Sequence, residues 1–249
     1  MLKANLPVHL LETLIIANSP ASLIQADRVI GEMLTSAEEL GGVWDKGAAH
    51  NNVVGLDTEW KPVLKKGETS RTSILQVAGR EQCIFFDLMW LDSTDVNTCA
   101  AGWTLINKLL ASPYILKLGV SFRGDITKMC NDYTRGGVPV VEPFCEIQRL
   151  FPKGTQGRTL QTTVAHELDV DLDKTQQMSN WERRPLTEEQ IEYAALDAWI
   201  LISLFDRISV EAHNLLALNP LFLTPTPRVP ISKTPSLSPH SLPPSFNPP

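Results

Sequence analysis

The sequence predicts an α/β domain in which a mixed sheet is flanked by helices, and two observations support this fold class. Three apolar runs of strand length follow one another at residues 53–60, 73–78 and 83–87. After them, segments with helical spacing alternate with short apolar runs as far as about Leu215. Strands in succession followed by strand–helix alternation are typical of a sheet covered by helices.

The first elements are predicted by apolar spacing and by residues that begin helices. Residues 14–17 form a short apolar run, which indicates a first strand or an entry segment to the domain. Ser19 and Pro20 are typical of a helix start, and apolar residues at helical spacing extend this helix to about Leu40. A short turn at residues 79–82 joins the second and third of the three strands, which predicts an antiparallel meander.

The second half of the chain predicts helices that alternate with extended segments. The expected elements are a helix at 103–110, a strand at 115–120, a helix at 122–133, an extended segment at 138–147, a helix at 159–168 and a long helix to about 215. Gly136 and Gly137 are expected to close the helix that begins at residue 122. Thr187 and Gln190 have the spacing of a capping box, which predicts the start of the last helix.

The composition divides the chain into a domain at 1–218 and a tail at 219–249. Ten of the 18 prolines fall in the tail, together with serine and threonine, and the tail has no acidic residue. Such a segment has too little apolar content to bury a core, so we expect it to be disordered. Its proline runs are candidate ligands for a proline-binding module, with a plain unstructured terminus as the simpler alternative.

Composition also narrows the class of protein and its surroundings. The four cysteines lie far apart and form no C-x-x-C pair, so neither a zinc motif nor a disulfide framework is expected. The N-terminal apolar stretch is interrupted by His9 and Glu12, which makes it a poor signal peptide. We therefore expect an intracellular protein of the cytoplasm, the nucleus or both, with no membrane partner. A net charge of −6 means that nucleic-acid binding would depend on local basic patches.

Two carboxylates mark the end of the strand at 53–60. Asp57 and Glu59 are two residues apart, so their side chains emerge on the same face of the strand. Two acids held this close repel each other unless a cation lies between them, and a hard divalent ion prefers oxygen ligands. The pair is therefore a candidate metal site, although the same pattern also occurs at ordinary strand ends.

Two further acidic positions strengthen the case for a metal site. Asp125 is expected in the first turn of the helix at 122–133, where an acid is also favoured by the helix dipole. Tyr193 and Asp197 are four residues apart on the last helix, so they share one face of it. An acid among the small residues of a packing face needs a partner, and a metal ion would supply one. For Tyr193 alone, a half-buried core position is the alternative.

Together these residues resemble the three exonuclease motifs of the DEDD superfamily, in its tyrosine-bearing subgroup. The motifs are Asp57-x-Glu59, Asp125 and Tyr193-x-x-x-Asp197. The flanking residues 54–60 and 179–187 are similar to those of the Werner-syndrome exonuclease domain and RNase D, and the run 172–186 is most similar to the Nibbler-type branch. The histidine-bearing subgroup would place histidine where this chain has Glu192. The resemblance covers roughly residues 10 to 212.

The resemblance implies a ribonuclease-H-like fold with a mixed five-stranded sheet, and a 3′–5′ exonuclease acting on single-stranded nucleic acid, RNA more than DNA. Four carboxylates suit two divalent ions, Mg²⁺ or Mn²⁺, which activate water and support the leaving oxygen. We assign Asp57 as the shared ligand, Glu59 and Asp197 to the water-activating ion, and Asp125 to the second ion. Tyr193 is expected to orient or deprotonate the attacking water, and its ordinary pKa makes orientation the easier role.

Substrate contacts are predicted from neighbouring aromatic and basic residues. Trp60 is a candidate for stacking on the terminal base, with core packing as an equal alternative. Lys174, Arg183 and Arg184 are candidate phosphate contacts, and a solvated loop is the alternative. Arg71 and Arg123 are further candidates.

Two other functions remain open from the sequence. One is the same chemistry on DNA, as the Werner-type resemblance allows. The other is a non-catalytic scaffold that recruits partners through the tail. Nibbler-type proteins usually carry flanking domains that help to hold RNA, whereas this chain has the tail, so a shortened form is a further hypothesis.

Overall fold

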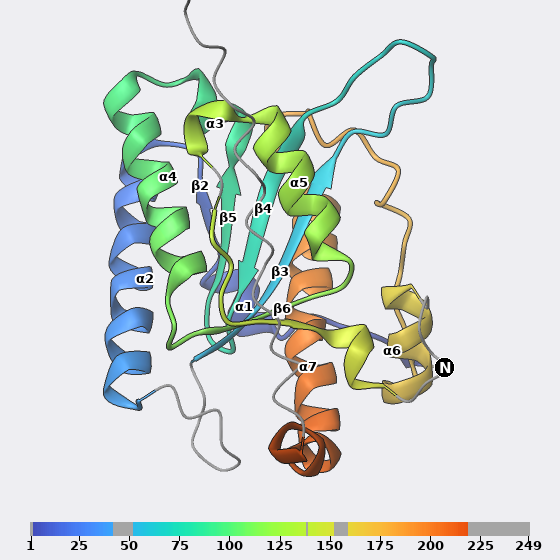
Figure 1. The fold of residues 1–249 in the computed structure, drawn as a ribbon. Helices are drawn as coiled ribbons and strands as arrows, with labels where there is room; N and C mark the ends of the chain where they lie inside the picture. Colours follow the sequence, from blue (N-terminus) through green and yellow to red (C-terminus); the bar gives the residue numbers. More distant parts are fainter. Residues whose placement is uncertain (1, 42–51, 138, 152–158, 219–249) are drawn as a thin grey trace, which may run out of the picture.

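A computed structural model describes residues 2–41, 52–137, 139–151 and 159–218. One six-stranded sheet lies between two groups of helices (Figure 1). The predicted tail at 219–249 lies outside the described residues, so its disorder and its partners stay predictions.

The sheet is mixed, as predicted, but within the described residues it has six strands where five were expected. Its order is β2-β5-β4-β3-β6-β7. The three central strands form the predicted antiparallel meander, and β2, β6 and β7 add parallel pairs at the two sides. The extra strand is β2, the segment that the sequence left as a strand or an entry, which pairs with β5. The strands are β2 (Ile15–Ala17), β3 (Val53–Trp60), β4 (Thr72–Ala78), β5 (Cys83–Asp87), β6 (Leu116–Gly119) and β7 (Phe144–Glu146).

Helices cover both faces of this sheet because alternate residues of its strands point to opposite sides. On β4, Ile74 faces the core beneath α7, whereas its neighbour Leu75 faces the core beneath α2 and α4. Figure 1 shows α2 and α4 side by side on their face of the sheet. That face carries α2 (Pro20–Glu39), α3 (Leu88–Ser93), α4 (Val96–Ala111) and α5 (Phe122–Asp132). The other carries α1 (Val8–Glu12), α6 (Leu160–Leu168) and α7 (Glu188–Leu218).

Helix starts follow local capping chemistry. The backbone N–H of Thr187 donates to the Gln190 side chain at 3.1 Å, and the N–H of Gln190 donates to the Thr187 hydroxyl at 3.2 Å, which confirms the capping box. The helix predicted from residue 103 begins earlier, at Val96, because the Asp95 carboxylate caps the N–H groups of Asn97 and Thr98. Among the helices that the structure describes, none has the length and the hydropathy required to span a bilayer.

Short elements that the sequence did not predict complete the fold. Strands β1 (Leu2–Lys3) and β8 (Val170–Asp171) form a small parallel sheet, so the N-terminal segment pairs with the segment that leads towards α7. Two short 3₁₀ helices, η1 (Thr134–Gly136) and η2 (Ile147–Leu150), follow α5 and β7. The helix expected to close at Gly136–Gly137 therefore ends as an α-helix at Asp132 and continues through η1.

A charged side chain lies inside the core at β6. Lys117 is 0% exposed, and its ammonium donates to the backbone carbonyls of Ser112 at 2.6 Å and Glu142 at 2.8 Å. Burial disfavours the charged form and lowers the pKa of Lys117 to about 7. Since this pKa is lower in the folded chain, the unfolded chain binds more protons from about pH 7 up to the ordinary lysine value.

Replacing Lys117 with methionine should therefore change how stability depends on pH. We expect the free energy of unfolding of the wild type, relative to Lys117→Met, to rise with pH above about 7, by at most about 1.4 kcal/mol per pH unit. Urea unfolding of both proteins across this range measures the difference. Parallel pH profiles would show that Lys117 keeps an ordinary pKa in the fold.

Candidate active site

The β3 strand presents its acids to α7. Val53, on the same face of β3 as Asp57 and Glu59, belongs to the core beneath α7. Gly55, between Val53 and Asp57 on this face, lies so close to α7 that a Cβ there would be 1.9 Å from the carbonyl oxygen of Ala198. A glycine is therefore required at this position for α7 to approach β3. The close approach places Asp197, the residue before Ala198, against the strand that carries the two acids.

Three carboxylates meet at this contact. Asp57, Glu59 and Asp197 each offer an oxygen, and these oxygens all lie within 4.8 Å of one another. Asp197 is 2% exposed and Glu59 is 8% exposed. Burial, followed by the charges of Asp197 and Asp125, raises the pKa of Asp57 well above its ordinary value. Burial and the charge of Asp57 raise the pKa of Glu59 in the same way, so the three acids repel one another unless a cation joins them.

Asp125 is the fourth acid of the site and comes from α5. It lies in the first turn of α5, as predicted, and lines the same pocket as the three carboxylates. Among the described residues, the cluster within 4.8 Å does not include it. Burial and the nearby charge of Glu146 raise the pKa of Asp125 to about 7. Asp125 thus lines the pocket outside the close cluster, which suits a ligand of a second ion.

Tyr193 lies one helical turn before Asp197 and is held by packing. Its ring is tilted by 44° against Trp181, with ring centroids 5.8 Å apart. Burial, followed by the charges of Asp197 and Glu59, raises the pKa of Tyr193 above its ordinary value. The hydroxyl therefore stays protonated at neutral pH, which favours orientation of a water molecule over its deprotonation. Tyr193 therefore packs in the core and also lines the acidic pocket.

Lys174 reaches the same carboxylates from the loop between β8 and α7. Its ammonium donates to Asp197 Oδ2 at 2.7 Å and lies 3.4 Å from the Tyr193 hydroxyl. The sequence placed Lys174 near substrate phosphates but gave no sign of a contact with Asp197. The side chain is thus part of the acidic site itself, and a phosphate contact stays a prediction.

One pocket brings together most of the predicted site residues: Asp57, Glu59, Trp60, Asp125, Lys174, Tyr193 and Asp197 all line it. Trp60 lines it and is half-buried, and the Lys128 ammonium lies over its ring, 5.6 Å from the centroid, so stacking on a base stays a prediction. Gln161, Gln177 and Met178 also line the pocket and were not predicted. Gln177 and Met178 lie in the run 172–186, but nothing in the sequence assigned them or Gln161 a role, because α6 and the loop before α7 approach β3 only in the folded chain.

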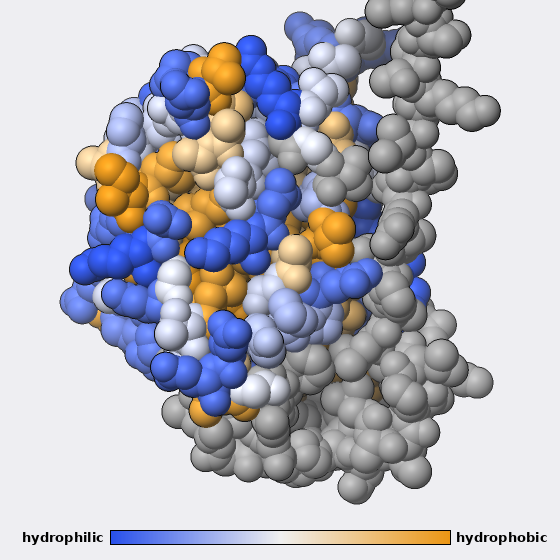
Figure 2. All heavy atoms as spheres, turned by 60° about the vertical axis from the view of Figure 1, so that its left-hand side comes forward, coloured by the Kyte–Doolittle hydropathy of each residue, from blue (hydrophilic) through white to orange (hydrophobic). Residues whose placement is uncertain are grey.

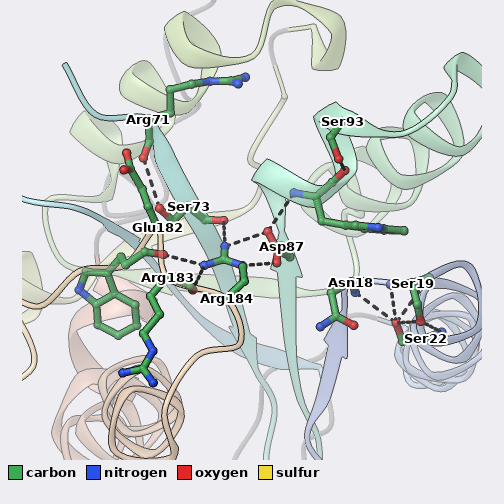
Figure 3. A network of polar contacts seen from close by, with 12 residues as sticks. Asn18, Ser19, Ser22, Arg71, Ser73, Asp87, Ser93, Glu182, Arg183 and Arg184 are labelled. Atoms are coloured by element: carbon green, nitrogen blue, oxygen red, sulfur yellow. Dashed lines mark hydrogen bonds and ion pairs between the residues drawn. The ribbon is translucent and has the colours of Figure 1, made fainter.

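The predicted arginines lie outside this pocket. Figure 3 shows the Arg184 guanidinium bridging to Asp87, the residue that caps α3, while Arg183 points away from this pair. Arg184 also donates to the backbone carbonyls of Trp181 at 2.7 Å and Ser73 at 3.3 Å, so it fixes the loop before α7 to the sheet. These contacts give Arg184 a structural role, and a phosphate contact by Arg184 or by the exposed Arg183 stays a prediction.

Arg71 and Arg123 stand apart from the pocket in the same way. The Arg71 guanidinium donates to Asp92 at 2.9 Å and stacks over the Tyr133 ring, 4.1 Å from its centroid. These contacts give Arg71 a structural role at the end of α5. Neither Arg71 nor Arg123 is among the residues that line the pocket.

The acidic site fits divalent ions. All of its donors are carboxylate oxygens, the ligand type that Mg²⁺ and Mn²⁺ prefer. Asp197 Oδ1 is buried and has no hydrogen-bond partner among the described residues. A buried carboxylate oxygen without a donor is costly unless a cation binds it.

Comparisons with a family model and with known proteins agree that this chain is similar to exonucleases. A family model described as 3′–5′ exonuclease matches residues 32–212. The human exonuclease mut-7 homolog is 33% identical over 177 residues, which cover 65% of this chain and 20% of that protein. The chain thus spans about a fifth of the length of this relative.

Two solved structures share the fold. The Nibbler EXO domain of Aedes aegypti superposes with a TM-score of 0.64 at 21% identity, covering 86% of this chain and 94% of that one. Escherichia coli RNase D gives a TM-score of 0.57 at 22% identity, covering 84% of this chain and 47% of that one. These likenesses identify the ribonuclease-H-like exonuclease fold. With its acidic residues and tyrosine in one pocket, the chain belongs to the 3′–5′ exonuclease family, in the tyrosine-bearing DEDD subgroup near the Nibbler-type branch.

Proposed function

We propose that this domain removes nucleotides from the 3′ end of single-stranded RNA with the help of two divalent ions. The observation that carries this proposal is the pocket in which Asp57, Glu59 and Asp197 meet and which Tyr193 and Asp125 also line. Membership of the exonuclease family supports the reaction type. The non-catalytic alternative is disfavoured, because a scaffold has no need of four partly or fully buried acids around one pocket.

Each residue of the site has a distinct role in this proposal. Asp57 would be the shared ligand, Glu59 and Asp197 would hold one ion, and Asp125 would hold the other. When bound, such ions lower the pKa of the attacking water and stabilise the charge that develops on the phosphate. The protonated Tyr193 hydroxyl donates a hydrogen bond to the attacking water and orients it. Trp60 stacks on the terminal base, which tolerates any base identity.

The relatives support RNA, rather than DNA, as the proposed substrate. The E. coli RNase D structure is described as that of an exoribonuclease involved in structured RNA processing. A preference for RNA requires a contact to the 2′-hydroxyl, and Gln161 and Gln177 at the pocket are candidates because amide groups both donate and accept. The same chemistry on DNA remains the second candidate, which the Werner-type flanking residues favour.

A degradation assay on matched substrates tests the proposal. End-labelled single-stranded RNA and DNA of the same sequence are incubated with the chain in Mg²⁺, Mn²⁺ or EDTA. We expect RNA to be shortened from its 3′ end in either metal and to stay intact in EDTA. A blocked 3′ end should stop the reaction, and a blocked 5′ end should not. Full degradation in EDTA would contradict a metal-dependent mechanism, and faster loss of DNA would select the second candidate.

Replacing Tyr193 with phenylalanine should separate the hydroxyl from the ring. The ring packs on Trp181, so folding and metal binding should survive the change. Positioned proton-transfer groups contribute roughly 10²–10⁴-fold, and we expect a fall in kcat near the lower end because the ions perform most of the activation. KM should change little, since the water is oriented mainly in the transition state. Steady-state kinetics decide the matter, and an unchanged kcat would leave Tyr193 with a packing role alone.

A further inference from the structure

Lys174 places a positive charge inside the acidic site. Its ammonium is 2.7 Å from Asp197 Oδ2 and 5.2 Å from the centroid of the Tyr193 ring. The Lys174 side chain is 20% exposed and that of Asp197 only 3%, so this ion pair is largely shielded from water. The charge of Lys174 also lowers the pKa of Asp57 and Glu59, which means that it interacts with the whole cluster. The ammonium thus offsets part of the repulsion among the carboxylates.

The loop before α7 is shaped to present this side chain. Asp173, next to Lys174, accepts a hydrogen bond from the backbone N–H of Thr175 at 2.8 Å. The backbone N–H of Gln177 donates to the Lys174 carbonyl at 3.2 Å, which closes a turn around the residue. Lys3 pairs with Asp173 at 3.6 Å, beside the β1–β8 pairing. These contacts support the backbone around Lys174, while the four-carbon stem of lysine lets its ammonium change position.

We propose that Lys174 is an internal counter-cation that competes with the divalent ion for Asp197, and so sets the metal concentration at which the site fills. This proposal rests on the proposed function only in that the acidic cluster binds a divalent ion. A divalent ion on the Asp197 carboxylate and the Lys174 ammonium, 2.7 Å from its Oδ2, repel each other in a shielded site. Metal binding therefore weakens this ion pair, and that cost lowers the apparent affinity for the metal.

Calorimetric titration of Mn²⁺ into the 249-residue chain tests the competition without any nuclease assay. We expect Lys174→Met to bind Mn²⁺ about tenfold more tightly than the wild type, as if about 1.4 kcal/mol of competing ion pair were removed. In EDTA the variant should melt at a lower temperature than the wild type, because the acids lose their counter-cation. Added Mn²⁺ should raise its melting temperature by more than it raises that of the wild type.

Lys61 supplies a matched control for net charge. It follows Trp60, which lines the pocket, but its ammonium pairs with Glu182 at 3.4 Å instead of with the cluster. Lys61→Met removes the same charge, and we expect its Mn²⁺ affinity to stay within about twofold of the wild type, since exposed charges are well screened. Lys174→Gln is a second neutral variant, which decides the question if Lys174→Met does not fold.

Two results would overturn the competition. One is unchanged or weaker Mn²⁺ binding in the neutral Lys174 variants, which would make Lys174 a bystander or a supporting contact. The other is an equal gain in affinity in Lys61→Met, which would attribute the effect to the general field of the protein. Either result leaves the proposed function intact if the wild type degrades RNA. A wild type that binds Mn²⁺ but leaves RNA and DNA intact would instead refute the proposed function.

Discussion

Replacing Asp57 with asparagine should abolish exonuclease activity while leaving the domain folded. Asp57 interacts with other acids of the site, since the charges of Asp197 and Asp125 raise its pKa. Asparagine has the same shape but loses the charge that would hold two ions. Ions in such sites contribute several kcal/mol to the stabilisation of the transition state, so we expect kcat to fall by about 10³-fold or more.

The thermal stability of Asp57→Asn should stay at the wild-type level or rise, although its activity falls. A buried carboxylate among like charges destabilises the fold, so Asp57→Asn should melt in EDTA at or above the wild-type temperature. Asp27→Asn, on the exposed side of α2, is the control for a change of one charge and should leave both rate and stability close to the wild type. Thermal melts and single-turnover assays measure the two quantities. Wild-type RNA degradation by Asp57→Asn would show that the catalytic site lies elsewhere.

Local geometry explains why the core of the site was predictable. A strand has a period of two, so the spacing of Asp57 and Glu59 places both side chains on one face wherever the strand lies. A helix places residues four apart on one face, which joins Tyr193 to Asp197. The capping box at Thr187 depends only on neighbouring residues and is confirmed. No local pattern shows that α7 packs against β3. That contact, which brings Asp197 to Asp57 and Glu59, could be expected only from the family resemblance.

Contacts between distant segments explain what was missed. Arg184 and Asp87 are 97 residues apart, and neither has a local signal that identifies its partner. An arginine in a loop therefore suggested a phosphate contact, whereas the fold uses it to fix that loop to the sheet. Lys174 was selected for its charge, but its contact with Asp197 depends on how the loop before α7 packs against β3. The sixth strand, β2, was also uncertain, because a three-residue run has too weak a pattern to predict pairing.

Replacing Gly55 with alanine should disrupt both the fold and the site. The added Cβ would lie 1.9 Å from the Ala198 carbonyl oxygen and 3.2 Å from the Leu201 Cβ, so α7 would have to move away from β3. Overpacking costs typically 1–3 kcal/mol and occasionally more, and a clash with backbone cannot be relieved by a side-chain rotation. We therefore expect a loss of roughly 3 kcal/mol or more in the free energy of unfolding. Since α7 carries Asp197, any molecules that fold should bind Mn²⁺ weakly and have little activity.

Two further variants identify the clash as the cause. Gly31→Ala on α2 adds the same methyl group where no atom lies within 4 Å, and it should stabilise the helix by up to about 1 kcal/mol. Ala198→Gly, combined with Gly55→Ala, should not restore stability, because the clash is with the carbonyl oxygen of residue 198 and not with its side chain. Urea unfolding of the single and double variants, with Mn²⁺ titration of those that fold, measures both effects. Wild-type stability and metal affinity in Gly55→Ala would mean that α7 does not approach β3 this closely, and that Asp197 meets Asp57 by some other arrangement.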